Sequence, residues 1–206
     1  MRHNPKHAVT DEAVVRTLIA EHPWATLVSH HDGELVASHY PILLDEQRED
    51  LAIVTHVGRP DDRVHGFGGG QEILLIVAGP HGYISPSWYA AGDTPAPTWN
   101  FSVAHCYGVP EILDADENLR VLTRLVAHFE RHVDDPVHLD PEVGARIAPG
   151  TVGIRLPITR FVCKVKMSQD KGEASRRQVL AQLRGDGPYA SPALADDMER
   201  ALRDAR

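Results

Sequence analysis

Apolar and β-branched residues recur along the chain at two spacings, and each spacing predicts one kind of element. Apolar residues at helical spacing predict a first helix over about residues 11–21, which Pro23 ends. Residues 24–31 and 34–44 are apolar stretches on either side of Asp32-Gly33, and an Asp-Gly pair in that setting is a strong hairpin signal. The chain therefore begins with a helix and an antiparallel hairpin.

The same two spacings continue to the end of the chain. They predict further strands at residues 50–56, 72–78, 103–113, 151–156 and 158–166. They predict further helices at about residues 114–131, at 173–183 and from Ser191 onward. The apolar stripe of the middle helix is expected to consist of Leu119, Leu122, Val126, Phe129 and Val133. Residues 79–100 are rich in Gly, Pro, Ser and aromatic residues, which predicts a long loop of the kind that often carries function.

This order of elements predicts the fold class. Most strands are joined by short turns, and helices stand at both ends of the chain and in its middle. We therefore expect a mainly β fold with peripheral helices (α+β) around an antiparallel barrel. No GxGxxG motif follows a strand, so a parallel dinucleotide-binding sheet is not expected. We expect one domain over residues 1–206, with C-terminal helices over about 172–206.

Composition narrows the function classes. The chain has 206 residues and a formal net charge of −8, so a surface devoted to nucleic acid is not expected, because the phosphate backbone would be repelled. Cys106 and Cys163 form no CxxC motif, which excludes thiolate zinc sites, iron–sulfur clusters and covalently attached haem. The apolar stretches are too short to span a bilayer and we find no secretory signal, so the expected location is the cytoplasm and no membrane partner is expected.

His56 is the histidine whose position is most informative. It ends a predicted strand and is followed three residues later by Arg59. An imidazole can ligate iron, and a guanidinium can hold a carboxylate or phosphate, so this pair would suit a flat anionic cofactor. The alternative is a structural histidine that caps the strand end. His128 and His132 lie four residues apart on a predicted helix, but that helix is expected to use Phe129 and Val133 for the core, which favours solvated histidines over a metal site.

A second group of candidates is basic. Arg160, Lys164, Lys166 and Lys171 surround Ser168-Gln169. Strand alternation places Lys164 and Lys166 on one face, and a basic ladder that ends in a hydroxyl and an amide would suit an anion. Alternatively, these lysines protect a sheet edge from aggregation. The serines of the chain lie in no GxSxG elbow, so a hydrolase is not expected.

Three segments carry a resemblance to a known family. Residues 79–89 read GPHGYISPSWY, residues 97–101 read PTWNF, and residues 164–171 read KVKMSQDK. In order and spacing these segments strongly resemble the PaiB-like family. The resemblance implies an antiparallel split β-barrel that binds FMN, in a homodimer with the cofactor at the subunit interface. Members of the family are commonly labelled negative transcriptional regulators.

One segment departs from the family pattern. The family usually carries HxARANPQ, whereas residues 56–63 read HVGRPDDR, which retains His56 and Arg59 but introduces Asp61 and Asp62. Carboxylates at this place weaken the binding of a nearby phosphate dianion by charge repulsion. A branch of similar length and motifs, the haem-dependent piperazate synthases, binds b-type haem through one histidine. That resemblance implies an enzyme that forms an N–N bond by dehydrative cyclisation of side-chain N-hydroxylated L-ornithine to piperazic acid.

We therefore rank three hypotheses. The first is the haem-dependent cyclase, with an amino-acid substrate and with His56 as catalytic residue and axial iron ligand; His65 is the second choice, and His39 and His105 are weaker. The alternative is an FMN-binding transcriptional regulator or flavin reductase of the PaiB type. A DNA-binding regulator without a cofactor comes third, because no helix-turn-helix or basic recognition helix is evident.

The resemblance also gives a set of cofactor-binding residues. We expect Arg59 and Lys166, with Ser168 and Gln169, to hold the haem propionates or the FMN phosphate. We expect Trp88, Trp99 and Asn100 to line the pocket, together with Ser85 of the same motif. The alternative for the tryptophans is that they fill the barrel core, since large aromatic side chains suit that role.

Overall fold

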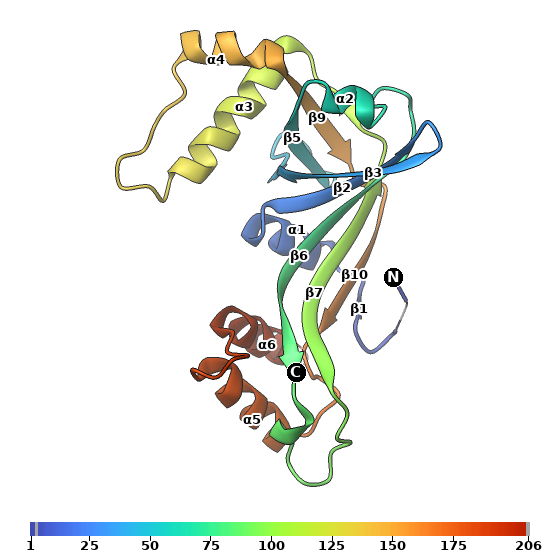
Figure 1. Ribbon diagram of the computed structural model, residues 1–206, viewed down its shortest axis with the longest axis vertical. Coiled ribbons are helices and arrows are strands. Elements are labelled where there is room, and N and C mark those ends of the chain that lie inside the picture. Colours follow the sequence, from blue (N-terminus) through green and yellow to red (C-terminus); the bar gives the residue numbers. More distant parts are fainter. Residues whose placement is uncertain (3, 205–206) are drawn as a thin grey trace. The chain divides into compact units, whose positions relative to one another are not determined.

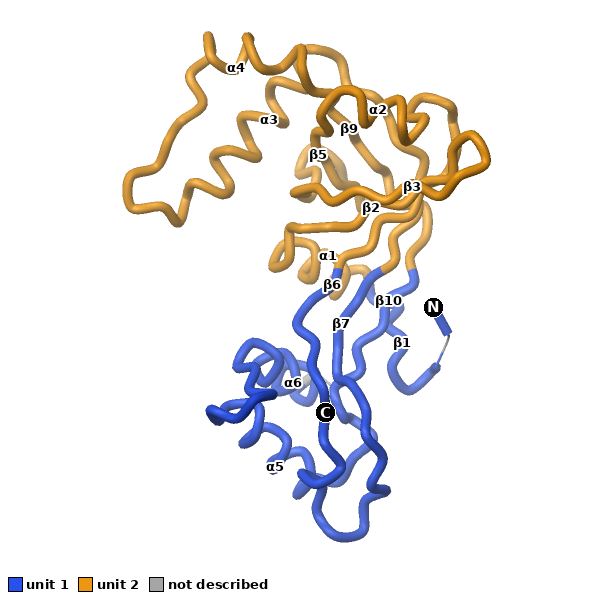
Figure 2. The backbone as a smooth tube through the Cα atoms, in the orientation of Figure 1, with its two compact units in different colours: residues 1–11, 78–104, 162–206 blue, residues 12–77, 105–161 orange. Residues whose placement is uncertain are grey.

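The computed structural model describes residues 1–2 and 4–204, and the chain forms two compact units (Figure 2). Unit 1 consists of residues 1–11, 78–104 and 162–206, and unit 2 consists of residues 12–77 and 105–161. The chain passes between them at residues 11–12 and within three strands, namely β6 (Ile73–Ile84), β7 (Thr98–Gly108) and β10 (Arg160–Lys166). Within the described residues, no helix is long and apolar enough to cross a membrane.

Antiparallel strands dominate the architecture. The first sheet has the strand order β1-β10-β7-β6-β2-β3, and the second has the order β4-β5-β9-β8. The remaining strands are β1 (Ala8–Val9), β2 (Trp24–His31), β3 (Glu34–Pro41), β4 (Leu43–Leu44), β5 (Ala52–Gly58), β8 (Glu111–Ile112) and β9 (Thr151–Pro157). The predicted mainly β fold with peripheral helices is thereby confirmed.

The helices divide between the two units (Figure 1). Unit 2 contains α1 (Glu12–Glu21), α2 (Asp61–Val64), α3 (Ala115–Glu130), α4 (Pro141–Ile147) and the 3-10 turn η2 (Ala148–Gly150). Unit 1 contains the 3-10 turn η1 (Pro86–Trp88), α5 (Glu173–Arg184) and α6 (Pro192–Asp204). The four helices predicted from sequence are present as α1, α3, α5 and α6, whereas β1, α2, α4 and the 3-10 turns were not predicted.

The hairpin predicted at Asp32-Gly33 is confirmed. β2 pairs with β3 in a register that places His31 opposite Glu34, so only two residues form the turn. Asp32 has φ 51° and Gly33 has φ 84°, the left-handed conformation that a tight hairpin turn needs at both positions. Aspartate and glycine tolerate this conformation better than other residues, which explains why the sequence signal was reliable.

Unit 2 combines an apolar cluster with a buried ion pair. The cluster joins the second sheet to α3 and consists of Leu43, Val54, Leu113, Val121 and Leu125. Nearby, Nε of Arg155 donates to Oδ2 of Asp45 at 2.6 Å, and the Asp45 side chain is 1% exposed. Arg155 also bonds Glu117 of α3 at 3.0 Å. Because burial of a single charge is costly, these partners depend on one another.

Unit 1 has its own core at the end of the long strands. One buried residue of β6 and one beside β10 meet the inner faces of α5 and α6; the cluster consists of Ile84, Met167, Val179, Leu183, Leu194, Ala195 and Met198. A Cβ atom added to Gly82 would lie 2.9 Å from Cδ2 of Leu194, so glycine allows α6 to approach the strand. Apolar packing therefore anchors both C-terminal helices to unit 1.

The prediction of a continuous loop over residues 79–100 was wrong. β6 extends to Ile84 and β7 begins at Thr98, so only residues 85–97 connect the two strands. Pro80 lies in this extension of β6, although proline cannot donate a ladder hydrogen bond. β2 pairs with β6 only as far as Val77, so Pro80 lies beyond the stretch where β6 has β2 as a neighbour.

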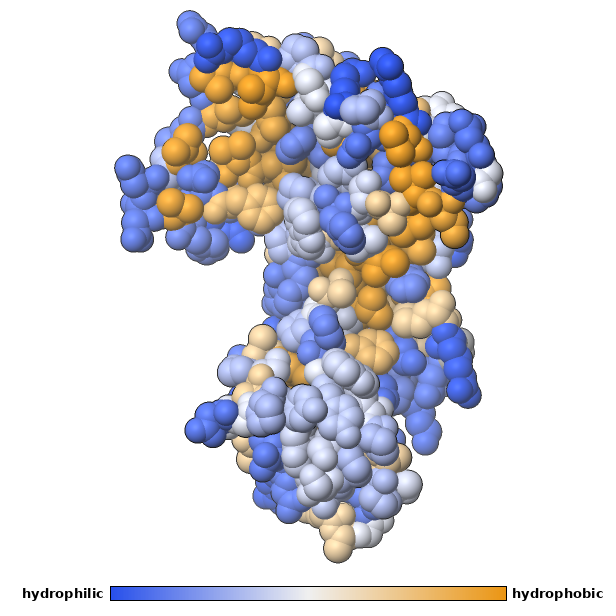
Figure 3. Space-filling view, in the orientation of Figure 1, coloured by the Kyte–Doolittle hydropathy of each residue, from blue (hydrophilic) through white to orange (hydrophobic). Residues whose placement is uncertain are grey.

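The predicted apolar stripe of α3 was also partly wrong. The buried face consists of Asn118, Val121, Leu122 and Leu125. Phe129 and Val133 are 44% and 49% exposed, and orange residues gather over α3 and α4 in Figure 3. The buried Asn118 explains the error, because its amide donates to Thr151 Oγ1 at 3.0 Å and thereby occupies a core position with a polar residue.

Candidate functional site

The predicted site residues belong to both units, and each part is described in its own unit. Unit 2 contains His56 and Arg59. Unit 1 contains the other predicted residues, namely Ser85, Trp88, Trp99, Asn100, Lys166, Ser168 and Gln169. No group of three or more His, Cys, Asp or Glu side chains among the described residues is arranged to hold a metal ion.

His56 is a half-buried histidine with an unsatisfied nitrogen. It lies within β5 opposite Gly153 of β9, and the strand continues to Gly58, so His56 does not end the strand as predicted. Its Nδ1 atom is buried and has no hydrogen-bond partner. Burial lowers the pKa of His56, so the ring is neutral at neutral pH. A neutral imidazole with an unpaired nitrogen fits either an iron ligand or a hydrogen-bond partner for a bound group.

The other histidine candidates fit a ligand role less well. His65 is fully buried, and its Nδ1 and Nε2 atoms lie 2.8 Å and 2.9 Å from the hydroxyls of Ser29 and Ser38. Both ring nitrogens are therefore engaged. Nδ1 of the exposed His39 lies 3.0 Å from the hydroxyl of Thr26. Burial lowers the pKa of His105, on β7, as it lowers that of His56, so this property does not separate the two histidines.

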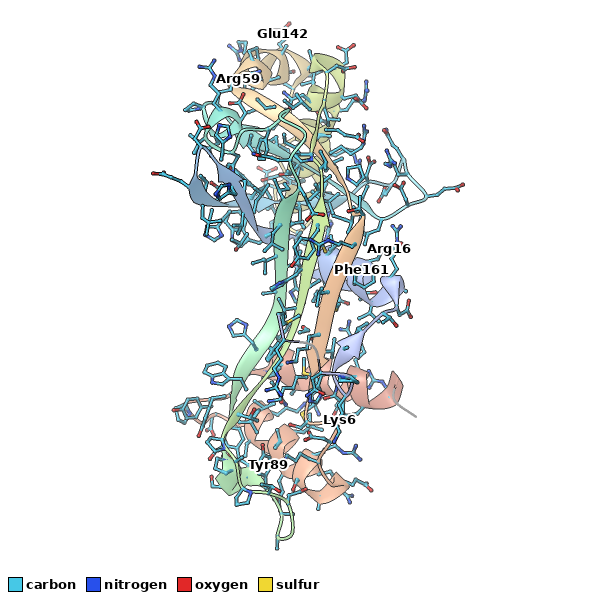
Figure 4. The ribbon with its side chains drawn as sticks, turned by 90° about the vertical axis from the view of Figure 1, so that its right-hand side faces the viewer. Lys6, Arg16, Arg59, Tyr89, Glu142 and Phe161 are labelled. Carbon is cyan, nitrogen blue, oxygen red and sulfur yellow. The ribbon has the colours of Figure 1, made fainter. Side chains whose placement is uncertain are left out.

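Arg59 lies at the surface of unit 2, beside α2 (Figure 4). Its backbone nitrogen donates to Gly150 at 3.0 Å, and its Nε donates to the carbonyl oxygen of Pro149 at 3.2 Å. Nη1 donates to Oδ2 of Asp62 at 3.3 Å. Half of the side chain remains exposed, so an anion can reach the guanidinium, but it must compete with Asp62.

Arg59 also lines a cleft of about 420 Å³. The cleft lies among β9, the start of α3 and the segment from α4 to η2, and its walls include Ile112, Leu119, Ala145 and Pro149. A volume of this size is within the range of small-molecule pockets. The mixture of apolar walls and one guanidinium can accept an anionic ligand with an apolar body.

In unit 1, Lys166 is tied to the start of β7. Its ammonium group donates to the hydroxyl of Thr98 and to the carbonyl oxygen of Trp99, the latter at 3.0 Å. Burial lowers the pKa of Lys166. Lys164, on the same strand face, instead places its ammonium group 5.5 Å from the ring centre of Phe101. Lys166 therefore organises the backbone at Trp99, and Lys164 does not.

The predicted hydroxyl and amide partners are used inside the fold. Asn100 Nδ2 donates to Ser168 Oγ at 3.0 Å, and both residues are buried. Gln169 Oε1 accepts from the backbone of Met167, and its Nε2 donates to the carbonyl oxygen of Val165, both at 2.6 Å. In this arrangement Ser168 and Gln169 secure the end of β10.

The aromatic residues form a partly exposed cluster, in which Trp88 packs against the core of unit 1. The Trp99 side chain is 54% exposed, so the alternative that it fills the barrel core is not supported. Its ring centre lies 6.4 Å from that of His81 and 6.3 Å from that of Tyr83. Tyr189 lies 5.1 Å from Tyr83 and 6.5 Å from Trp88. The hydroxyl of Ser85 lies 2.8 Å from that of its near neighbour Ser87.

Sequence reasoning missed two residues of unit 1. Tyr189 joins the aromatic cluster from the segment before α6. His7 is 6% exposed, and its Nδ1 atom is buried without a hydrogen-bond partner. Burial lowers the pKa of His7, which interacts with Asp170 and Lys166. No sequence signal indicated His7, because its neighbours in the fold come from the opposite end of the chain.

Comparison with known proteins identifies the family. Residues 1–160 match the family model described as "Putative FMN-binding domain". The chain belongs to this FMN-binding domain family. It is also 28% identical over 203 residues to the protease synthase and sporulation protein PAI 2 of Bacillus subtilis, with 97% of each chain covered. The resemblance to the PaiB-like family is thereby confirmed.

Solved structures show the same split-barrel fold. The FAD- and haem-binding protein of Mycobacterium smegmatis aligns with a TM-score of 0.60 at 16% identity, covering 78% of this chain and 73% of that chain. The flavocytochrome Anf3 of Azotobacter vinelandii aligns with a TM-score of 0.60 at 20% identity, covering 81% of this chain and 72% of that chain. At sequence identities of 16% and 20%, this similarity shows a shared fold.

Proposed function

We propose that the protein binds FMN and acts as a PaiB-type regulator or a flavin reductase. The observation that carries this proposal is the match of residues 1–160 to an FMN-binding family, supported by similarity to PAI 2 over nearly the whole of both chains. A cytoplasmic location and a homodimer with the cofactor at its interface are parts of the same proposal. They rest on the sequence and on the family resemblance.

Each unit offers its own candidate feature for this ligand, and each feature is tested by its own variant. The half-exposed guanidinium of Arg59 would bind phosphate, and the cleft beside it offers apolar walls. The exposed face of Trp99 would stack against a flat ring system. When bound, FMN supplies reversible electron transfer. The chain itself would supply charge pairing, stacking and exclusion of water.

The test is a titration of the purified protein with FMN, followed by quenching of flavin fluorescence. We expect saturable binding that Arg59→Ala weakens about tenfold, since a charged hydrogen bond is worth about 1.5 kcal/mol or more. Arg63→Ala is the matched control, because this exposed arginine belongs to the same loop. Riboflavin, which lacks the phosphate, should bind both variants alike. Absence of saturable FMN binding would refute the proposal.

A second candidate is favoured by His56. Its buried, unpartnered Nδ1 and its neutral ring would suit the axial ligand of haem b, as the resemblance to piperazate synthases implies. In that case the substrate would be N-hydroxylated L-ornithine, and the product piperazic acid would form with loss of water. We expect haemin to give a sharp Soret band that His56→Ala abolishes and the control His39→Ala preserves.

An assay for product by mass spectrometry separates the two candidates further. N-Hydroxylated ornithine should be converted only by haem-loaded protein if the cyclase hypothesis is correct. Flavin binding without a Soret band or product would leave the FMN proposal standing and refute the cyclase.

A further inference from the structure

The two C-terminal helices form a groove that the proposed function does not use. α5 and α6 lie side by side in unit 1 (Figure 1), with a cleft of about 330 Å³ between them, which we call the α5–α6 groove. Its lining residues come from residues 173–180 of α5 and 199–203 of α6. Both helices follow the residues 1–160 that match the family model. None of the groove residues belongs to the features proposed above for FMN.

The floor of the groove is apolar. Leu180 of α5 and Leu202 of α6 line it, and both are partly buried side chains that pack against the core of unit 1. A ligand with an apolar body would cover what remains exposed of these two leucines and remove it from water. Among the described residues that line the groove, none is aromatic, so an aliphatic body suits it better than a flat ring that needs a stacking partner.

The walls of the groove are charged. They carry the side chains of Arg176, Arg177 and Arg203, together with those of Glu173 and Glu199. Three positive charges against two negative ones leave a local excess of one positive charge, in a chain whose formal net charge is −8. The groove is therefore a local site of attraction for an anion. Because two carboxylates stand in the same walls, they repel a dianion more strongly than a monoanion.

The arginines of the groove differ in how far their charge is neutralised within the protein. Arg177 pairs with Glu173 of its own helix at 3.3 Å. Glu199 binds Arg184 most closely, at 2.7 Å, whereas Nη1 of Arg203 approaches it only at 4.0 Å. The bond between Arg184 and Glu199 also joins α5 to α6, so the groove is held together by an ion pair as well as by the core beneath it.

Arg176 is the arginine that the fold leaves available. Within residues 1–2 and 4–204, no hydrogen bond or ion pair joins its side chain to another residue, although Arg176 is partly buried. A guanidinium can bind a carboxylate through two parallel hydrogen bonds. We propose that the α5–α6 groove binds an aliphatic monocarboxylate, with the carboxylate on Arg176 and the aliphatic chain on Leu180 and Leu202. This site is additional to the FMN features, and the proposal does not depend on them.

The test is a calorimetric titration of the whole protein with sodium octanoate, below the concentration at which octanoate forms micelles. We expect saturable binding that Arg176→Ala weakens about tenfold, as for loss of a hydrogen bond between two charged groups. Glu173→Gln should strengthen binding about twofold, because it removes a repelling carboxylate. Arg200→Ala is the matched control, since Arg200 carries the same charge on α6 but does not line the groove, and it pairs with Asp197 at 3.6 Å.

Two further probes separate the contributions of the two ends of the ligand. Acetate lacks the aliphatic chain and should show no saturable binding over the same concentrations, whereas 1-octanol lacks the charge and should bind the wild type and Arg176→Ala alike. Absence of saturable octanoate binding, or equal losses in Arg176→Ala and Arg200→Ala, would overturn the proposal. Binding of duplex DNA in place of octanoate, lost in Arg176→Ala, would assign the groove to a nucleic acid and overturn it as well.

Discussion

Arg59 and Asp62 form an ion pair across the first turn of α2, with Nη1 and Oδ2 3.3 Å apart. The side chain of Arg59 is half exposed, whereas that of Asp62 is 14% exposed, and Oδ1 of Asp62 is buried without a hydrogen-bond partner. The carboxylate therefore stands behind the guanidinium and reduces its positive charge toward an incoming anion. An anionic ligand must therefore compete with the carboxylate of Asp62 for the guanidinium of Arg59.

Asp62→Asn should consequently strengthen the binding of FMN. A half-exposed ion pair is worth about 0.2–1 kcal/mol, so removal of the competitor should improve affinity by about two- to fivefold at low salt. The measurement is the FMN titration at low and high ionic strength, where the advantage should shrink as salt screens the charges. Riboflavin affinity should not change. Equal gains for both ligands would show that the effect does not act on the phosphate.

Buried histidines make the fold sensitive to acid. Burial is the largest influence on five histidines, and it lowers the pKa of His7, His56, His65, His105 and His128. The unfolded chain binds protons near pH 6.5, whereas the folded chain binds them only at lower pH, so stability should be lost as pH falls below about 6.5. Each histidine contributes at most about 1.4 kcal/mol per pH unit.

Urea unfolding at pH 7.5 and pH 5.5 measures this loss. His56→Gln should reduce the difference in unfolding free energy between the two pH values, because one buried titrating group is removed. His132→Gln is the control, since His132 is exposed. A pH dependence that is identical in both variants would contradict the assignment to His56.

Local signals predicted the fold well where they were strong. The turn at Asp32-Gly33 fixed the β2–β3 hairpin because few residues tolerate its backbone angles. Signals failed where tertiary contacts overrode them. The composition of residues 79–100 predicted a loop, but β6 continues to Ile84, past the end of its pairing with β2. The predicted stripe of α3 included Phe129, which is exposed, and omitted Asn118, whose amide bonds Thr151 from a buried position.

The candidate site was harder to predict for a physical reason. Sequence reasoning identified Arg59 and Trp99 as residue types that bind phosphate and flat rings, and both are exposed in the structure. It could not identify which candidate side chains already form hydrogen bonds with other parts of the fold. Ser168 and Gln169 are engaged within unit 1, and both nitrogens of His65 are taken by serines. Such occupancy depends on contacts between segments distant in the chain.

Removal of the buried carboxylate of Asp45 should strongly destabilise the protein. Arg155 donates to Asp45 at 2.6 Å, and its side chain is only 15% exposed. Asp45→Ala leaves this guanidinium short of its nearest counter-charge, which typically costs about 3–5 kcal/mol. The measurement is the midpoint of urea unfolding, with Asp50→Ala as control because the pair of Asp50 with Arg48 is at the surface. Similar losses in both variants would contradict the special role of burial.

Lys166 should influence cofactor binding through Trp99. Its ammonium group donates to the carbonyl oxygen of Trp99 at 3.0 Å and to the hydroxyl of Thr98, so it fixes the backbone that carries the exposed ring. Lys166→Met preserves the length of the side chain but removes these bonds. We expect FMN affinity to fall about 3- to 10-fold, as for loss of one or two hydrogen bonds to a charged group, with a matching change in Trp99 fluorescence.

Lys164→Met separates this positional effect from general electrostatics. Both lysines lie on one face of β10 and carry the same charge, but Lys164 contacts the ring of Phe101 rather than the Trp99 backbone. If Lys166 acts by position, Lys164→Met should retain FMN affinity, and Trp99→Ala should weaken binding in the wild type more than in Lys166→Met. If the two lysine variants lose affinity equally, the lysines act through their charge alone. In that case the bond between Lys166 and Trp99 is a feature of the fold with no part in binding.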